Sequence, residues 1–269
     1  MIPTRDELKA VFYDTLKFIE DDVTLSQASA ETNRHTKVYP PDFAEETEAH
    51  KAGKIMVVQG RTLQTALKVH EEFPDSRIAV LNFAASQRPG GGVTNGSRAQ
   101  EESICRSSTL YPSLKTVKAY EGFYSFHYNG GFGWKASDAC IYSPDVVICR
   151  DDSDNIPARL SPDKFVKIDV ITCAAPHIFD NVRISDSNLY AMHLSRAKNI
   201  LRVCAHNSVD ILVTGAFGCG AFNNPPEIVA KAWNEALSVY REKFSLIVFA
   251  IYCNNSESEN YRVFHDVLI

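Results

Sequence analysis

From residue 54 onward, short apolar runs alternate with longer segments in which apolar residues recur at helical spacing. The runs predict strands buried on both faces; they lie at 54–59, 77–85, 145–151, 165–175, 210–217 and 245–252. The segments with one apolar stripe predict amphipathic helices at 62–73, 189–206 and 229–240. This alternation predicts an α/β fold with a sheet between two helical layers.

The first 50 residues follow another pattern. Between residues 5 and 20, apolar residues recur at helical spacing and predict one helix: Leu8, Val11, Phe12, Leu16 and Ile19. The stretch 21–51 is polar, and Tyr39-Pro40-Pro41 would interrupt any regular element. We therefore expect residues 1–50 to form a helical extension packed on a single domain, residues 51–269.

Composition narrows the classes of function. Hydrophobic residues make up 45% and charged residues 23% of the 269, which is typical of a well-packed globular protein. A net charge of -5 argues against bulk nucleic-acid binding. No apolar window is long enough for a membrane span. Seven cysteines without a C-x-x-C pair, and eight scattered histidines, predict neither disulfides nor a metal site. We expect an intracellular, cytoplasmic monomer, with nuclear entry left open.

A first glycine-rich loop follows the predicted strand 77–85. Gly90-Gly91-Gly92 permit positive φ and let a ligand approach backbone N–H groups without interference from a Cβ. Such donors suit a phosphate. Taken alone, the run fits a tight strand-to-helix turn without a ligand equally well.

A second glycine-rich loop, Gly215 to Phe222, follows the predicted strand 210–217. It combines three glycines with Phe217 and Phe222, which offers amide donors for a diphosphate and flat apolar surfaces for sugars. The alternative is that both rings fill the core beneath a turn. In parallel sheets, loops after the strands meet where ligands bind, so two such loops in one sheet favour a ligand site.

Gln100-Glu101-Glu102 follow the first loop closely. Adjacent glutamates are usually a solvated helix start, where the helix dipole favours them. Consecutive helical side chains diverge, however, so one of these carboxyl groups can lie over a bound sugar. Glycosidic bond cleavage needs an acid for the leaving oxygen, and a carboxyl group is the usual one.

The run from Leu81 to Leu114 resembles the signature of the bacterial-type poly(ADP-ribose) glycohydrolases, a triple glycine followed six to eight residues later by Gln-Glu-Glu. Here the spacer is VTNGSRA. The run VTGAFGCGAFNNPPEIVA from Val213 resembles the diphosphate loop of the same family. The resemblance implies a three-layer α/β/α macrodomain with a mixed central sheet. It also implies ADP-ribose, or an ADP-ribosylated protein or polymer, as the ligand, and no cofactor.

The resemblance also implies roles for individual residues. Glu102 would be the general acid and base, Glu101 would hold ribose hydroxyls beside the scissile bond, and Phe222 would pack on that ribose. The implied substrate-binding residues are Gly90, Gly91, Gly92, Val93, Asn95, Gln100, Gly215, Ala216, Phe217, Gly218, Cys219, Gly220, Ala221 and Phe222. The first 50 residues would either cap the adenine pocket, through Phe12 or Tyr39 for example, or simply complete the fold.

Three other functions stay open at this stage. A related macrodomain enzyme would remove single ADP-ribose units from protein side chains, including arginine. A reader module would bind ADP-ribose without cutting it, although binding alone does not require the glutamate pair. A purely structural domain would leave both glycine loops unexplained.

Overall fold

The computed structural model describes residues 2–44, 48, 50–253 and 257–269. Its centre is one seven-stranded sheet in the order β1-β4-β5-β3-β6-β7-β2. The strands are β1 (Lys37–Tyr39), β2 (Lys54–Gln59), β3 (Ile78–Phe83), β4 (Cys140–Ile148), β5 (Val166–Cys173), β6 (Ile211–Thr214) and β7 (Leu246–Ile251). Strand β4 is antiparallel to both its neighbours, and all other pairs are parallel. Six strands therefore point one way, and the sheet is mixed as predicted.

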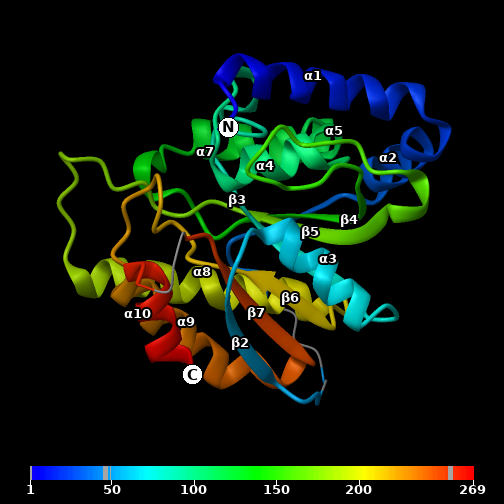
Figure 1. Ribbon diagram of the computed structural model, residues 1–269. Coiled ribbons are helices and arrows are strands. Elements are labelled where there is room, and N and C mark those ends of the chain that lie inside the picture. The colour runs from blue at the N-terminus through cyan, green and yellow to red at the C-terminus, as the bar shows by residue number, and fades with distance from the viewer. Residues whose placement is uncertain (1, 45–47, 49, 254–256) are drawn as a thin grey trace.

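Helices cover both faces of the sheet (Figure 1). They are α1 (Arg5–Asp21), α2 (Val23–His35), α3 (Thr62–Glu72), α4 (Gln100–Ser107), α5 (Leu110–Leu114), α6 (Val117–Ala119), α7 (Phe126–Asn129), α8 (Asp186–His206), α9 (Pro226–Tyr240) and α10 (Glu259–Leu268). One core cluster joins α8, α9 and α10 to the sheet, and a second joins α1, α3, α4 and α5 to its other face. The predicted three-layer α/β/α architecture is confirmed. No helix in the described part of the chain has the length and apolar character needed to cross a membrane.

Local chemistry explains where the first helix begins. The Thr4 side chain accepts a hydrogen bond from the Glu7 backbone, and the Glu7 carboxylate accepts one from the Thr4 backbone. This capping box satisfies N–H groups that the first turn leaves without partners. Leu8, Phe12 and Ile19 then lie on the buried face of α1, as their spacing predicted.

The polar segment after residue 20 holds α2, in keeping with a helical extension, and also strand β1, which the sequence pattern did not predict. Helix α2 is capped by Asp22 and buries only Leu25, Ser29 and Thr32, so its stripe is too polar to recognise from the sequence. Strand β1 pairs with β4 and is therefore part of the sheet. The boundary at residue 50 stays a prediction, but the first segment contributes a strand as well as helices.

Neither aromatic residue suggested as a cap over adenine lines a cleft. Phe12 is buried in the core and meets the Tyr111 ring edge-on at 4.9 Å. Tyr39 is buried at the end of β1 and exchanges hydrogen bonds with Asn207. Both residues therefore complete the fold.

Candidate active site

A two-lobed cleft opens at the carboxyl ends of the parallel strands. The smaller lobe has a volume of about 290 Å³ and the larger one about 720 Å³. They share five lining residues: Phe83, Ala99, Ala175, Ala221 and Phe222. The two lobes are therefore parts of one elongated cleft, where the topology of the sheet predicted a ligand.

Helix α4 supplies side chains to both lobes. Gln100 and Ser103 line the smaller lobe, whereas Glu101 and Glu102 line the larger one. Gln100 anchors the helix on β3: its side-chain oxygen accepts from the Phe83 backbone at 2.9 Å, and its nitrogen donates to the Leu81 carbonyl at 2.7 Å. The Gln100 side chain therefore pairs with the backbone of β3 as a neighbouring strand would, and it fixes the start of α4.

Each of the two glutamates accepts a hydrogen bond from a backbone N–H group, and the two N–H groups belong to different segments. Glu101 is 3% exposed, and its Oε2 accepts from the Ala85 N–H at 2.7 Å. Glu102 is 7% exposed, and its Oε1 accepts from the Gly92 N–H at 2.8 Å. The remaining oxygen of each, Glu101 Oε1 and Glu102 Oε2, is buried and has no partner among the described residues. Buried polar atoms without partners are rare, and here both belong to a cleft wall.

Burial and charge act together on the pair. Burial raises the pKa of Glu101 well above the ordinary carboxyl value near 4.5, and the neighbouring Glu102 carboxylate raises it further. The Ala85 N–H opposes this shift by stabilising the ionised form. Burial prevails, so the folded protein favours the protonated form of Glu101 more than a solvent-exposed carboxyl would.

The triple-glycine loop covers this pair without room for side chains. Gly91 has φ +55°, and a Cβ there would lie 2.7 Å from Glu102 Oε1 and 2.8 Å from Glu101 Oε2. Gly91, Gly92 and Asn95 line the larger lobe. Gly90 packs on the Tyr111 ring, and Val93 is fully buried, so neither of these predicted binding residues lines the cleft.

The second loop forms the opposite wall. Ala216, Gly218, Gly220, Ala221 and Phe222 line the cleft. In the part of the chain that the structure describes, the N–H groups of Gly218, Gly220, Ala221 and Phe222 donate no backbone hydrogen bond. Asn224 braces the loop, since its amide nitrogen donates to the carbonyl oxygens of Pro176 and Gly218. The loop therefore offers free donors on a fixed backbone.

Three other predicted residues of this loop do not line the cleft. Phe217 is buried beneath it, with its ring centroid 5.4 Å from that of Phe83. Gly215 lies against β7, where a Cβ would come 2.5 Å from the Ala250 carbonyl oxygen. Cys219 packs against the core. These residues support the loop from behind, which is the core role considered for Phe217 from the sequence alone.

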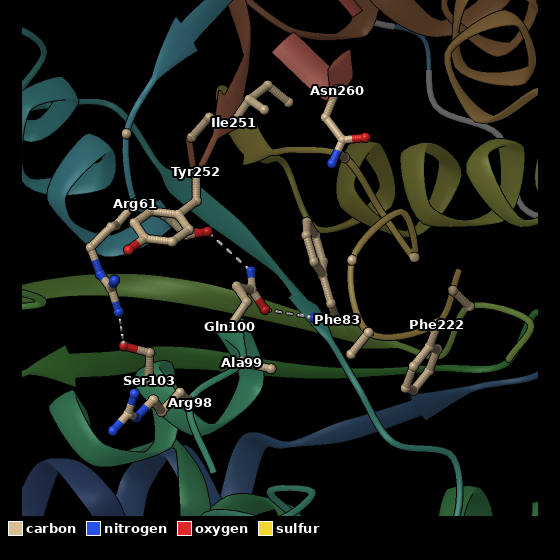
Figure 2. A pocket seen from close by; sticks show the side chains of 18 of the residues that line it. Arg61, Phe83, Arg98, Ala99, Gln100, Ser103, Phe222, Ile251, Tyr252 and Asn260 are labelled. Atoms are coloured by element: carbon tan, nitrogen blue, oxygen red, sulfur yellow. Dashed lines mark hydrogen bonds between the residues drawn. The ribbon is translucent and has the colours of Figure 1, made fainter. Parts of the chain in front are cut away.

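Phe222, by contrast, lies at the junction of the lobes. It is half-buried and stacks on the His177 ring, with centroids 4.4 Å apart and planes at 6°. In Figure 2 it lies across the smaller lobe from Arg61 and Tyr252. The ring is therefore placed to contact a ligand that spans both lobes.

Sequence reasoning missed most of the smaller lobe. Arg61 follows β2. Its Nε donates a hydrogen bond to Asp152 Oδ1 at 2.9 Å, and its Nη2 donates one to the Ser103 hydroxyl oxygen at 3.1 Å (Figure 2). Its guanidinium also lies 4.9 Å from the centroid of the Tyr252 ring. These residues come from four distant segments, and only the folded sheet brings them together. Within the described ranges, no group of three or more His, Cys, Asp or Glu side chains could hold a metal ion.

Comparison with known proteins agrees with this geometry. The family model of the microbial-type PARG catalytic domain matches residues 5–151, more than half of the chain. That range includes α1, the triple glycine and both glutamates, while the second loop lies beyond it. No curated protein sequence matches the chain.

Solved structures extend the similarity over almost the whole length. The poly(ADP-ribose) glycohydrolase from Thermomonospora curvata is 27% identical, with a TM-score of 0.80 over 97% of this chain and 98% of that one. The same enzyme bound to the inhibitor ADP-HPD gives 27% identity and a TM-score of 0.80 over 96% and 98%. The glycohydrolase from Deinococcus radiodurans in complex with ADP-ribose gives 29% identity and a TM-score of 0.76 over 89% and 96%. The chain thus belongs to the microbial-type poly(ADP-ribose) glycohydrolase family.

Proposed function

We propose that this chain binds ADP-ribose across its two-lobed cleft and hydrolyses the ribose glycosidic bond of poly(ADP-ribose), releasing ADP-ribose. The observation that carries the proposal is the pair of buried carboxyl oxygens without partners, Glu101 Oε1 and Glu102 Oε2, in the larger lobe. Leaving such atoms unsatisfied costs about 1–3 kcal/mol each, or more when charged. A sugar with its hydroxyls and glycosidic oxygen would satisfy both.

The rest of the cleft suits the remaining parts of ADP-ribose. The free N–H groups of the second loop, opposite the triple-glycine loop, form a cradle for the diphosphate. The smaller lobe offers Phe83, Ile251 and Tyr252 as surfaces for the adenosine, with the buried Asp152 as an acceptor. The terminal ribose then lies in the larger lobe, against the glutamates and Phe222.

The reaction follows from this placement. Glu102, held by Gly92 through Oε1, donates a proton from Oε2 to the glycosidic oxygen as the bond between that oxygen and the ribose C1″ breaks. The bonding electrons leave with the oxygen, and an oxocarbenium-like ribose remains beside the diphosphate. The Glu102 carboxylate then takes a proton from a water molecule that attacks C1″. Glu101, bound through Oε2 to the Ala85 N–H, holds a ribose hydroxyl with Oε1.

Substrate release assays separate this function from its alternatives. The protein is incubated with long polymer, with serine-linked and with arginine-linked mono-ADP-ribosylated protein, and free ADP-ribose is quantified. We expect release from the polymer and none from Glu102→Gln. Faster release from a mono-ADP-ribosylated protein would identify a mono-ADP-ribosyl hydrolase. Binding of ADP-ribose without any release would identify a reader. The monomeric state and intracellular location expected from the sequence stay predictions.

A further inference from the structure

The larger lobe exceeds what the terminal ribose requires. With adenosine in the smaller lobe, one sugar would occupy the larger lobe, although its volume is about 720 Å³ against about 290 Å³. The glutamates and the triple-glycine loop form one side of it. Trp134, His177 and Phe179 also line this lobe, and the proposed mechanism leaves them unused. The lobe therefore has room for part of the leaving group as well as for the terminal ribose.

Three rings in this lobe form a stack, here called the aromatic wall and made of Phe222, His177 and Phe179; of these, only Phe222 has a role in the proposed mechanism. His177 lies between the two phenylalanines, with centroids 4.4 Å from Phe222 and 3.8 Å from Phe179. The His177 N–H donates to the Trp134 carbonyl at 2.7 Å, which fixes the stack to the neighbouring loop. Burial lowers the pKa of His177, so its ring is uncharged at neutral pH.

The stack ends in an exposed aromatic face. Phe179 lies in the loop between β5 and α8. One face of its ring stacks on His177, and the side chain is still 49% exposed. An exposed ring at the end of a fixed stack is a platform for another planar group, and nucleobases stack on such rings regardless of their identity.

The larger lobe also contains a positively charged side chain, that of Arg88. Arg88 lines the same lobe and is exposed, and its side chain forms no ion pair with any described residue. Its backbone carbonyl accepts from the Gly91 N–H at 3.0 Å, so the triple-glycine loop fixes where the side chain starts. In a chain with a net charge of -5, an unpaired arginine in the same lobe as an aromatic platform suits a base that carries phosphates.

We infer that Phe179 and Arg88 form a subsite for the nucleotide on the leaving side of the scissile bond. The adenine of that polymer unit stacks on the exposed face of Phe179, and its phosphates lie near Arg88. The inference rests on the proposed function. It makes the chain selective for polymer over protein-linked single units, because only the polymer carries a base on the leaving side.

The test compares two substrates in Phe179→Ala. For polymer we expect kcat/KM to fall about tenfold, mainly through KM, which is the size of effect expected for one base–aromatic stack. For an ADP-ribose conjugate of a simple phenol, whose leaving group has no base, kcat/KM should stay within about twofold of wild type. Phe179→Trp should restore polymer hydrolysis. Tyr13→Ala, which removes an equally exposed ring (49%) on α1, is the matched control.

Arg88→Gln tests the phosphate contact, and it should make the KM for polymer less dependent on ionic strength. Equal losses on both substrates in Phe179→Ala would mean that the stack only positions Phe222, and would overturn the subsite. Polymer kinetics equal to those of Tyr13→Ala would overturn it as well. If the wild-type protein releases nothing from polymer, the proposed function itself fails, which is a distinct result.

Discussion

His193 on α8 holds Asn224 from behind the second loop, with Nε2 at 2.9 Å from Asn224 Oδ1. Burial lowers the pKa of His193 to about 4, so its ring is neutral and donates to the amide oxygen. The amide nitrogen of Asn224 is then directed at the carbonyls of Gly218 and Pro176. A buried side-chain pair outside the cleft thus fixes the backbone proposed to bind the diphosphate.

Asn224→Ala should therefore weaken both stability and binding. Each buried group left without a partner costs about 1–3 kcal/mol, so the free energy of unfolding should fall by at least that amount. The affinity for ADP-ribose should fall more than that for adenosine, because only ADP-ribose uses the loop. Urea denaturation and calorimetric titration measure the two effects. Unchanged ADP-ribose affinity in the folded variant would exclude the loop from the diphosphate site.

Glu102→Gln should abolish turnover while ADP-ribose affinity stays within about tenfold, or roughly 1.4 kcal/mol. The amide oxygen can still accept from the Gly92 N–H, but the amide has no acidic proton to transfer to the leaving oxygen. Released ADP-ribose and calorimetric affinity are measured on one preparation. If the variant kept more than a tenth of the wild-type rate, another group would have to be the acid.

Gly91→Ala should inactivate the protein because its Cβ would displace both glutamate oxygens, 2.7 and 2.8 Å away. Gly131→Ala is the matched control: its φ of +67° is equally unfavourable for alanine, but nothing lies within 4 Å of the added Cβ. Both variants should lose stability through backbone strain. Only Gly91→Ala should lose turnover per folded molecule; a similar loss in the control would point to strain alone.

The raised pKa of Glu101 predicts a pH-dependent stability. Between the ordinary value near 4.5 and the raised value, the folded protein keeps a proton that the unfolded chain releases. The stabilising contribution of the protonated carboxyl is therefore complete below pH 4.5 and is lost as the pH rises through the folded pKa. Glu101→Gln removes this titration, so its free energy of unfolding should gain on the wild type as the pH rises. Urea titrations from pH 4.5 to 8 test this, and a constant difference would contradict the assignment.

Phe222→Ala should lower the catalytic rate by far more than it lowers ADP-ribose affinity. Misplacing reacting atoms by about 1 Å costs on the order of a hundredfold, and Phe222 is half-buried at the junction of the lobes. Phe217→Ala, in the buried neighbour, should instead lose about 3–5 kcal/mol of stability. Melting temperature and rate are compared for both. If the folded Phe222→Ala variant had normal activity, Phe222 would contribute only to core packing and not to catalysis.

Much of the fold was predictable from apolar runs, because a strand buried on both faces needs consecutive apolar residues. Strand β1 escaped prediction because three residues gain their structure from pairing with β4. Helix α2 escaped because its buried positions include Ser29 and Thr32. The composition of β4 also does not indicate that it runs antiparallel to its neighbours.

The candidate site was predictable only where the chemistry is local. The glycine loops and Glu101-Glu102 are continuous segments whose composition restricts what they can do. Arg61, Asp152 and Tyr252 meet in the smaller lobe through long-range pairing, which no local pattern encodes. The aromatic wall is similar: His177 and Phe179 lie in an irregular loop, and only folding stacks them on Phe222.

The beginning of α1 has a consequence for how the reactive loop is maintained. A Cβ at Gly96 would collide with the Arg5 carbonyl oxygen, and Arg98 donates to the Pro3 carbonyl. The backbone at the start of α1 and just before it therefore packs against the residues that link the triple glycine to the glutamates. Local unfolding of the first turn of α1 would remove this packing. The start of α1 and the segment between the triple glycine and the glutamates should therefore unfold together, as one cooperative unit. Changes near Thr4 can thus silence chemistry that belongs to Glu102, without touching the substrate.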